Sequence, residues 1–239
     1  MLSVILPVYN ETEALERISS SLMGILAVLE VPFEIIFVND GSTDDSPGIL
    51  KQIKRDDHVV KVVNLERSFG QASALQAGFD NAAGKTIVTI DADLENDPRD
   101  IINLLEKLEE GYDCVCGARV GRPLSLKTFF SAFGNFVFRL LLRSPVRDMA
   151  CTLRVYKKET LQKIVLRGSM HRYLPLLLYL KGAKVSEVNV RYKARRFGKS
   201  KYGILKRLPE TLKDLLILLF AGKSMLDNKR KDYKIASIW

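Results

Sequence analysis

The chain has 239 residues, 47% of them hydrophobic and 27% charged, a balance that excludes a disordered protein and allows a sizeable core. Its charge is unevenly divided: residues 1–118 hold 9 Lys and Arg against 21 Asp and Glu, whereas residues 119–207 hold 22 against 3. Three cysteines are too few for a disulfide framework, and Cys114-x-Cys116 at the end of an apolar run favours buried reduced thiols over a metal site.

The first half predicts strands and helices in alternation. The expected strands are short β-branched and apolar runs, as in a parallel sheet that is covered on both faces. They span residues 3–8, 33–38, 59–64, 86–90 and 112–117, with helices expected over 12–29, 46–54, 72–83 and 97–110. Thr12 is expected to cap the first helix. This order predicts an α/β fold with a doubly wound parallel sheet.

Polar loops follow three of these strands. They are Pro7–Glu11, Asn39–Asp44 and Asp91-Ala92-Asp93, and ligands bind at the carboxyl ends of strands in such sheets. Two neighbouring carboxylates are costly unless a cation lies between them, and a hard divalent ion carrying substrate phosphates would fill that role. A solvated pair of Asp side chains in a turn is the alternative interpretation.

The second half is basic and predicts a different organisation. A basic loop over 119–123 precedes a helix over 127–142 whose aromatic residues favour core packing over a lipid-facing stripe. Strands are expected over 153–156 and 184–192, and helices over 158–164 and from Met170 onward. His171 is interpreted as a packed or solvated side chain rather than a ligand.

The last 45 residues combine a basic loop, a helix and a polar tail. Residues 195–203 hold four cations, one hydroxyl and flanking glycines, which is typical of a mobile loop that grips phosphate. Residues 204–220 predict an amphipathic helix that packs on the core or lies in a membrane interface. Residues 223–239 are expected to fray, with Trp239 as a candidate interfacial anchor. The longest apolar runs, 173–180 and 215–221, are shorter than the roughly 20 residues of a membrane span, so no transmembrane helix is expected.

Six motifs in order resemble the family 2 glycosyltransferases, within the branch of dolichyl-phosphate mannose synthases and bacterial polyprenyl-phosphate glycosyltransferases. They are Pro7–Glu11, Asn39–Ser42, Phe69–Gln71, Asp91–Leu94, Asp148 with Cys151–Leu153, and Gly198–Tyr202. The resemblance implies a GT-A fold with a mostly parallel Rossmann-like sheet over residues 1–203. Residues 1–118 would form its nucleotide and metal half and 119–203 its acceptor and lid half, followed by the amphipathic helix and polar tail of 204–239.

The resemblance also implies roles for individual residues. The nucleotide-sugar pocket would be lined by Pro7, Tyr9, Glu11, Asn39, Asp40, Gly70, Gln71, Asp91, Ala92 and Asp93. The metal residues would be Asp93, Asp91 and Glu95, with Asp93 binding Mg²⁺ or Mn²⁺ directly. Glu95 stands where the family commonly has Gln, so its role in binding the metal or the diphosphate would be altered. The acceptor phosphate would be held by Arg119, Lys127 and Ser131. The lid over the diphosphate would use Arg195, Arg196, Ser200 and Lys201. Asp91, Asp93 and Arg119 are the expected catalytic residues.

The expected reaction is an inverting transfer of mannose or glucose from GDP-mannose or UDP-glucose to a polyprenyl phosphate such as dolichyl or undecaprenyl phosphate. A lipid phosphate is already anionic at neutral pH and needs no strong general base, whereas a metal and cations must offset the charge of the leaving diphosphate. The protein is expected to be cytoplasmic and peripherally bound to the cytoplasmic face of the membrane, without a nucleic-acid partner.

Two other functions stay open at this point. The acceptor could be a soluble saccharide or a protein hydroxyl, which would need a general base, and Asp148 is the obvious acid of the basic half. A non-enzymatic module that binds membranes or nucleic acid would explain the basic half, yet it would leave Asp91, Asp93 and the Tyr9–Glu11 loop without a role.

Overall fold

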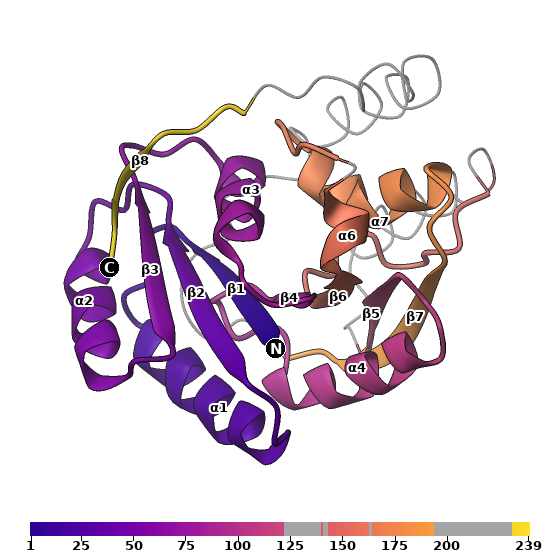
Figure 1. Ribbon diagram of the computed structural model, residues 1–239, viewed down its shortest axis with the longest axis horizontal. Coiled ribbons are helices and arrows are strands. Elements are labelled where there is room, and N and C mark those ends of the chain that lie inside the picture. Colours follow the sequence, from indigo (N-terminus) through magenta and orange to yellow (C-terminus); the bar gives the residue numbers. More distant parts are fainter. Residues whose placement is uncertain (122–139, 141–142, 163, 194–230) are drawn as a thin grey trace.

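The computed structural model describes residues 1–121, 140, 143–162, 164–193 and 231–239 (Figure 1). The expected helix over 127–142, the basic loop over 195–203 and the amphipathic helix over 204–220 lie wholly or almost wholly outside the described residues. The same holds for six expected site residues, namely Lys127, Ser131, Arg195, Arg196, Ser200 and Lys201.

The described strands form one eight-stranded sheet with the order β7-β5-β6-β4-β1-β2-β3-β8. The strands are β1 (Leu2–Val8), β2 (Phe33–Asn39), β3 (Val60–Leu65), β4 (Thr86–Thr89), β5 (Cys114–Val120), β6 (Arg154–Lys157), β7 (Val185–Arg191) and β8 (Ile235–Ile238). Strands β4, β1, β2 and β3 pair in parallel, as the sequence predicts, and β5 pairs in parallel with β7. The carboxyl ends of β1 to β4 therefore share one edge of the sheet.

Helices cover both faces of this sheet (Figure 1). They are α1 (Leu15–Val28), α2 (Ser46–Asp56), α3 (Gln71–Asn81), α4 (Ile101–Glu109), α6 (Lys158–Leu161) and α7 (Met170–Leu180), and a 3-10 turn, η1 (Pro98–Asp100), precedes α4. Helices α1, α2 and α4 pack on one face, and α3, α6 and α7 pack on the other. The predicted α/β architecture is confirmed.

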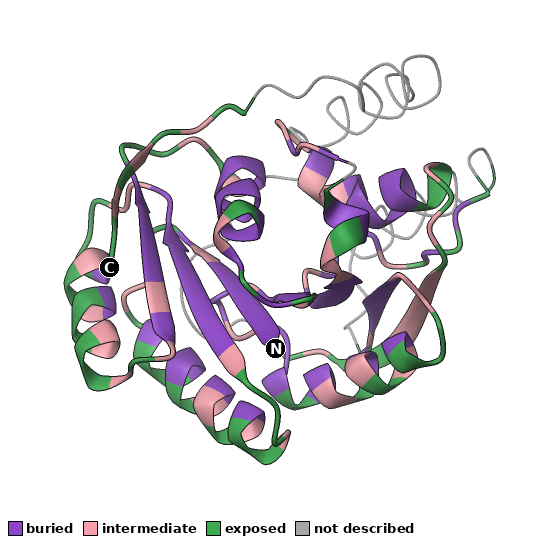
Figure 2. Cartoon of the chain, viewed as in Figure 1, coloured by how far each residue is buried: buried purple, intermediate pink, exposed green. Residues whose placement is uncertain are grey.

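The core follows from the period-two alternation of the buried strands, which are purple in Figure 2. Ile5 and Ile36 face the α3 side, whereas their neighbours Val4 and Phe37 face the α1 side, and all four are fully buried. Full burial of one such side chain stabilises the fold by about 1.5–3 kcal/mol, so both layers hold the sheet firmly. The loops at its carboxyl edge are thus attached to a rigid support.

The sheet is mostly parallel, as the resemblance implies, and β6 runs antiparallel between β4 and β5. Two local expectations are wrong. Thr12 does not cap α1, which begins at Leu15; its hydroxyl donates instead to Asp44 Oδ2. Arg119 does not lie in a loop but near the end of β5.

The C-terminal tail also differs from the expectation of a frayed end. Strand β8 pairs antiparallel with β3, and the backbone of Trp239 exchanges hydrogen bonds of 2.9 and 3.0 Å with Val62. The ammonium group of Lys51 lies 5.9 Å from the centre of the Trp239 ring. The described end of the chain is therefore an edge strand of the sheet, and its backbone hydrogen bonds to β3 hold this strand in place.

Candidate active site

The loops after β1 and β2 are joined by hydrogen bonds. The backbone N–H of Asn10 donates to Ser42 Oγ at 3.1 Å, and the N–H of Glu11 donates to Ser46 Oγ at 3.0 Å. The side chain of Asn10 accepts from the N–H of Thr43 at 2.8 Å. Asn10 has a φ of +56°, a left-handed conformation that Asn adopts more readily than most residues. These contacts hold the expected nucleotide residues of both loops side by side.

Asp40 joins the β2 loop to the segment between β3 and α3. Its carboxylate is buried and accepts hydrogen bonds from the Ser68 hydroxyl at 2.8 Å, the Phe69 N–H at 2.7 Å and the Gly70 N–H at 2.9 Å. Gly41 has a φ of +63°, and a Cβ there would lie 2.4 Å from the carbonyl carbon of Arg67. The close approach of these two loops thus requires glycine at position 41. A direct contact of Asp40 with a nucleotide base stays a prediction.

The Asp91-Ala92-Asp93 motif lies beside the same segment. The Gln71 amide donates to Asp91 Oδ1 at 2.9 Å, which ties the start of α3 to the end of β4. Asp93 is 4% exposed and accepts the N–H of Glu95 at 3.0 Å. Leu94 between them has a φ of +61°, so the chain turns sharply here. Both acidic side chains are held by the protein rather than lying in a solvated turn.

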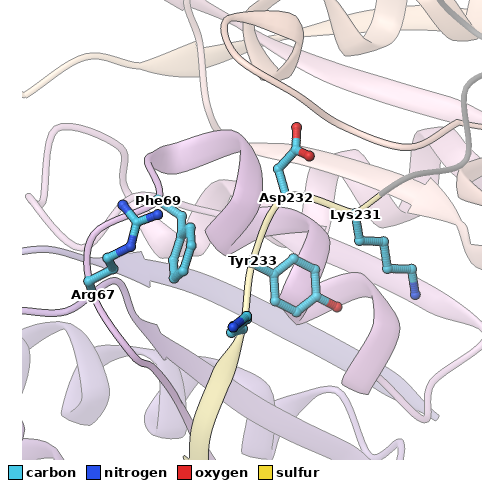
Figure 3. A pocket seen from close by; sticks show the side chains of 6 residues that line it. Arg67, Phe69, Lys231, Asp232 and Tyr233 are labelled. Atoms are coloured by element: carbon cyan, nitrogen blue, oxygen red, sulfur yellow. The ribbon is translucent and has the colours of Figure 1, made fainter.

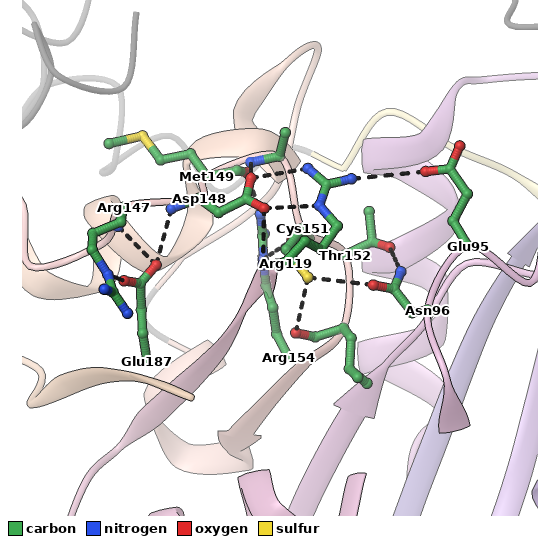
Figure 4. A network of polar contacts seen from close by, with 12 residues as sticks. Glu95, Asn96, Arg119, Arg147, Asp148, Met149, Cys151, Thr152, Arg154 and Glu187 are labelled. Carbon is green, nitrogen blue, oxygen red and sulfur yellow. Dashed lines mark hydrogen bonds and ion pairs between the residues drawn. The ribbon is translucent and has the colours of Figure 1, made fainter. Parts of the chain in front are cut away.

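Arg119 connects this acidic loop to the second half of the chain (Figure 4). Its Nε and Nη2 donate to the Asp148 carboxylate at 2.8 and 2.9 Å, and its Nη1 lies 3.7 Å from Glu95 Oε2. The Arg119 side chain is only 6% exposed. Burial opposes its charge, but the bond to Asp148 outweighs burial and raises the pKa of Arg119 above its ordinary value. A permanently charged guanidinium therefore stands beside the acidic motif.

A second buried arginine supports the Asp148 loop, and sequence reasoning missed it. Arg154 is 4% exposed and donates, over 2.7–3.1 Å, to the carbonyl oxygens of Met149, Cys151, His171 and Arg172. Next to it, Asn96 accepts from the Cys151 thiol at 3.4 Å and donates to the Thr152 hydroxyl at 3.1 Å. These bonds fix the loop that carries Asp148, and nothing in the local sequence pattern identifies them.

A surface hollow of about 290 Å³ lies at the carboxyl end of β3 (Figure 3). It is lined by Arg67, Phe69, Lys231, Asp232, Tyr233 and Lys234. The guanidinium of Arg67 lies 4.4 Å from the centre of the Phe69 ring. Because β8 brings residues 231–234 to this edge, basic side chains from segments far apart in the sequence meet beside the Phe69–Gln71 motif. Because a frayed tail was expected, the sequence did not predict that these side chains lie together.

The donor chemistry of the acidic motif fits a hard divalent ion. Within the described part of the chain, no three His, Cys, Asp or Glu side chains are grouped closely enough to hold a metal by themselves. Asp91 and Asp93 nevertheless offer carboxylate oxygens, and ions such as Mg²⁺ are commonly bound by one or two carboxylates with substrate phosphates as further ligands. The predicted buried thiols are confirmed: Cys114, Cys116 and Cys151 are free and buried.

The fold and this edge define an α/β protein with an acidic site at the carboxyl ends of its parallel strands, and comparison with known proteins gives the family. A model described as Glycosyl transferase family 2 matches residues 3–165. The dodecaprenyl-phosphate galacturonate synthase of Rhizobium johnstonii is 32% identical over 225 residues, which are 92% of this chain and 66% of that protein. The undecaprenyl-phosphate 4-deoxy-4-formamido-L-arabinose transferase of Pectobacterium carotovorum is 36% identical over 220 residues, which are 91% of this chain and 67% of that protein. The chain belongs to glycosyl transferase family 2, and it spans about two thirds of the length of these relatives.

Solved structures confirm the expected GT-A fold. Mannosyl-3-phosphoglycerate synthase from Rubrobacter xylanophilus superposes with a TM-score of 0.75 at 18% identity, over 96% of this chain and 77% of that chain. Glucosyl-3-phosphoglycerate synthase from Mycobacterium tuberculosis, in complex with Mn²⁺, UDP and glucosyl-3-phosphoglycerate, superposes with a TM-score of 0.70 at 20% identity. That match covers 100% of this chain and 87% of the other.

The structure thus brings most of the expected site residues to one edge. Hydrogen bonds and ion pairs lead from the Asn10 loop through Asp40, Gln71 and Asp91 toward Glu95 and Arg119. Pro7 lies inside β1, paired with Val38, and belongs to the strand that supports the edge. Asn39 donates to Asn64 at 3.0 Å and accepts from the Ser42 N–H at 3.0 Å, so it shapes the loop.

Proposed function

We propose that this protein transfers a sugar from a nucleotide-diphosphate donor to a polyprenyl phosphate. The observation that supports this proposal most directly is the link made by Glu95, whose N–H donates to Asp93 at 3.0 Å and whose carboxylate lies 3.7 Å from the buried guanidinium of Arg119. Carboxylates suit a metal-bound diphosphate, and a guanidinium suits the phosphate of an acceptor. The names of the relatives, which specify dodecaprenyl and undecaprenyl phosphate, support the acceptor class.

The side chains of this chain would act by binding and orientation. The loops after β1, β2 and β3 would hold the nucleoside, with Tyr9, Glu11 and Asp40 lining it. Asp93 and Asp91 would hold Mg²⁺ or Mn²⁺, which when bound would offset charge on the leaving diphosphate. Arg119 would orient the acceptor phosphate so that its oxygen faces the anomeric carbon. Because that oxygen is already anionic, a single displacement with inversion needs no general base.

Asp148 is a poor candidate for a general base, which weakens the alternative with a hydroxyl acceptor. Both of its carboxylate oxygens accept hydrogen bonds from the Arg119 guanidinium, at 2.8 and 2.9 Å. A base in that position would have to give up a bidentate ion pair in order to take a proton. We therefore favour the phosphate acceptor over a saccharide or protein hydroxyl.

The identity of the donor's sugar and nucleotide is the more specific part of the proposal. The resemblance implies mannose or glucose, whereas the relatives are named for galacturonate and 4-deoxy-4-formamido-L-arabinose. UDP-glucose is bound in a structural neighbour from M. tuberculosis. A donor screen should accordingly include UDP-glucose, UDP-galacturonate and GDP-mannose, together with the formamido-arabinose donor.

The first test is thermal melting with Mn²⁺ or Mg²⁺ and UDP, GDP, CDP or ADP. Binding to the folded state raises the melting temperature, and we expect a metal-dependent rise with one nucleotide that Asp93→Asn abolishes. Asp56→Asn, at an exposed position of α2, is the matched control and should keep the rise. Transfer of the donor's radiolabelled sugar to undecaprenyl phosphate then tests the acceptor. The absence of both a nucleotide shift and a labelled lipid would refute the proposal.

Contact with a membrane surface is part of the same proposal. Among the described residues, no helix is sufficiently long and apolar to cross a bilayer. The excess of basic residues after position 118 would favour anionic lipids, and that attraction weakens with salt. We expect flotation with anionic liposomes at low ionic strength; failure to float would contradict peripheral binding.

A further inference from the structure

Three neighbouring strands, β7, β5 and β6, each hold the Asp148 loop, residues 147–151, with one charged side chain (Figure 4). These side chains are Glu187 on β7, Arg119 on β5 and Arg154 on β6. Glu187 and Arg154 both pair with Cys116 of β5, so the three residues form a row across the sheet and their side chains point to one face. The loop itself contains neither helix nor strand, so these side chains determine where it lies.

Glu187 binds the N–H groups at the start of the Asp148 loop. Its Oε1 accepts from the N–H of Arg147 at 2.7 Å and from the N–H of Asp148 at 3.0 Å, and its Oε2 accepts from Arg147 Nε at 2.9 Å. The Glu187 side chain is only 4% exposed. Hydrogen bonds to an ionised acceptor are stronger than neutral ones, so this carboxylate fixes the backbone of Asp148.

Arg154 binds carbonyl groups further along the same loop. Its Nη2 donates to the Met149 carbonyl at 2.7 Å, and its Nε donates to the Cys151 carbonyl at 2.8 Å. Backbone polar groups next to a core need partners, and here an anion supplies them for the N–H groups and a cation for the carbonyls. The Asp148 loop is therefore held from both sides, by β7 and by β6.

The position of Asp148 in turn determines the orientation of Arg119. The Asp148 carboxylate accepts from Nε and Nη2 of Arg119 at 2.8 and 2.9 Å, and this two-point contact fixes the plane of the guanidinium as well as its distance. A displacement of the Asp148 backbone would therefore turn the Arg119 guanidinium.

We infer that Glu187 is a positioning residue for the acceptor phosphate and acts through the Asp148 loop and Arg119. This inference rests on the proposed function, in which Arg119 orients that phosphate. Without the Glu187 carboxylate, the N–H groups of Arg147 and Asp148 lose their acceptor and the loop shifts. The hydrogen bonds that join the loops after β1, β2 and β4 are made by other residues, so nucleotide binding should be spared.

Two substitutions separate the hydrogen bonds of Glu187 from its charge. In Glu187→Gln one carbonyl oxygen remains to accept both N–H groups, whereas Glu187→Ala removes every bond. Glu34→Ala is the matched control for a lost buried carboxylate, because Glu34 is 10% exposed and accepts from the Ser3 hydroxyl and the Ala83 N–H, each at 2.6 Å. Glu34 lies near the start of β2, at the opposite edge of the sheet from the candidate site.

The test is calorimetric titration with farnesyl phosphate, a water-soluble isoprenyl phosphate, and separately with Mn²⁺ and the nucleoside diphosphate that stabilises the wild type in the melting test. We expect Glu187→Ala to bind farnesyl phosphate about 10- to 100-fold more weakly, the usual effect of displacing an orienting group. Its nucleotide affinity should equal that of the wild type. Glu187→Gln should restore farnesyl phosphate binding, and Glu34→Ala should keep both affinities.

Three results would overturn the inference. They are wild-type farnesyl phosphate affinity in Glu187→Ala, an equal loss of nucleotide affinity in that variant, and the same loss of farnesyl phosphate affinity in Glu34→Ala. If Glu187→Ala does not fold, Glu187→Asp decides, because it keeps the charge but is one methylene too short to reach the loop. It should bind farnesyl phosphate more weakly than Glu187→Gln, and equal affinities would also overturn the inference. A wild type that neither binds farnesyl phosphate nor transfers sugar refutes the proposed function itself.

Discussion

Replacing Asp40 with Asn should destabilise the protein, because the carboxylate joins two loops at the functional edge. One oxygen accepts from the Phe69 N–H at 2.7 Å, and the other accepts from the Gly70 N–H and the Ser68 hydroxyl at 2.9 and 2.8 Å. An Asn side chain has one acceptor oxygen and one amide donor. The serine hydroxyl can rotate to accept, but a backbone N–H cannot.

The size of the effect follows from counting these donors. Whichever way the new amide at position 40 is turned, the N–H of Phe69 or of Gly70 faces an NH₂ group and loses its acceptor. A buried donor without a partner costs about 1–3 kcal/mol, and hydrogen bonds to a charged acceptor are about 1 kcal/mol stronger than neutral ones. We therefore expect a loss of about 2–4 kcal/mol in the free energy of unfolding. For a chain of this size, that lowers the melting temperature by roughly 4–16 °C.

Urea denaturation followed by far-UV circular dichroism measures this loss as a shift of the midpoint. The exposed Asp56→Asn exchange on α2 is the control for a lost carboxylate and should shift the midpoint little. Nucleotide affinity, measured under strongly native conditions, should fall as well, because the Ser68–Gly70 segment loses its attachment. An Asp40→Asn midpoint equal to that of the wild type would refute the hydrogen-bond count.

Two further predictions concern protonation. Burial, together with Arg172 and Arg154, lowers the pKa of His171 to about 3, whereas the unfolded chain takes up this proton near pH 6.5, so stability should fall as the pH drops from about 6.5 toward 3. His171→Gln should flatten this dependence in pH-resolved urea titrations and His58→Gln, whose side chain is 96% exposed, should not; identical slopes in both variants would contradict the assignment. All three cysteines are buried, and burial raises the pKa of Cys151 to about 12 and that of Cys116 well above its ordinary value. None of the three thiols should therefore react with Ellman's reagent at pH 8 until urea unfolds the chain. Rapid labelling of the native protein would show that a cysteine is accessible.

Much of the fold could be predicted because its signals are local. Five strands of the first half are short runs of apolar residues, and each is followed by a polar loop or a helix start. Where such strands pair in parallel, their carboxyl ends meet at one edge, so the Tyr9, Asp40 and Asp91 loops had to lie together. The contact between Gln71 and Asp91 is a consequence of that rule.

The features that escaped prediction are the direction of β6, the strand β8 and the hydrogen bond of Thr12, and each depends on a partner distant in the sequence. Strand β6 resembles any short buried strand, and only its place between β4 and β5 makes it antiparallel. Ile235–Ile238 is a short polar-apolar segment that is stable as a strand because β3 offers an unpaired edge. Thr12 has the chemistry of a cap, yet the Asp44 carboxylate competes for its hydroxyl from another loop. The direction of β6, the pairing of Ile235–Ile238 and the hydrogen bond of Thr12 therefore cannot be predicted from the neighbouring residues in the sequence.

The structure explains part of the uneven division of charge along the sequence, because acidic and basic residues of the two halves form ion pairs. Several acids of the first half pair with bases of the second: Glu95 with Arg119, Asp97 with Lys193, Asp100 with Arg191 and Asp113 with Lys157. Part of the opposite charge of the two halves is therefore used to join them across the β5 and β7 side of the sheet. Among the four pairs, that of Glu95 and Arg119 has the longest separation, at 3.7 Å, and it alone stands next to the Asp93 motif. The other three pairs join the two halves at 3.0 Å, whereas the pair of Glu95 and Arg119 links the Asp93 loop to the basic half.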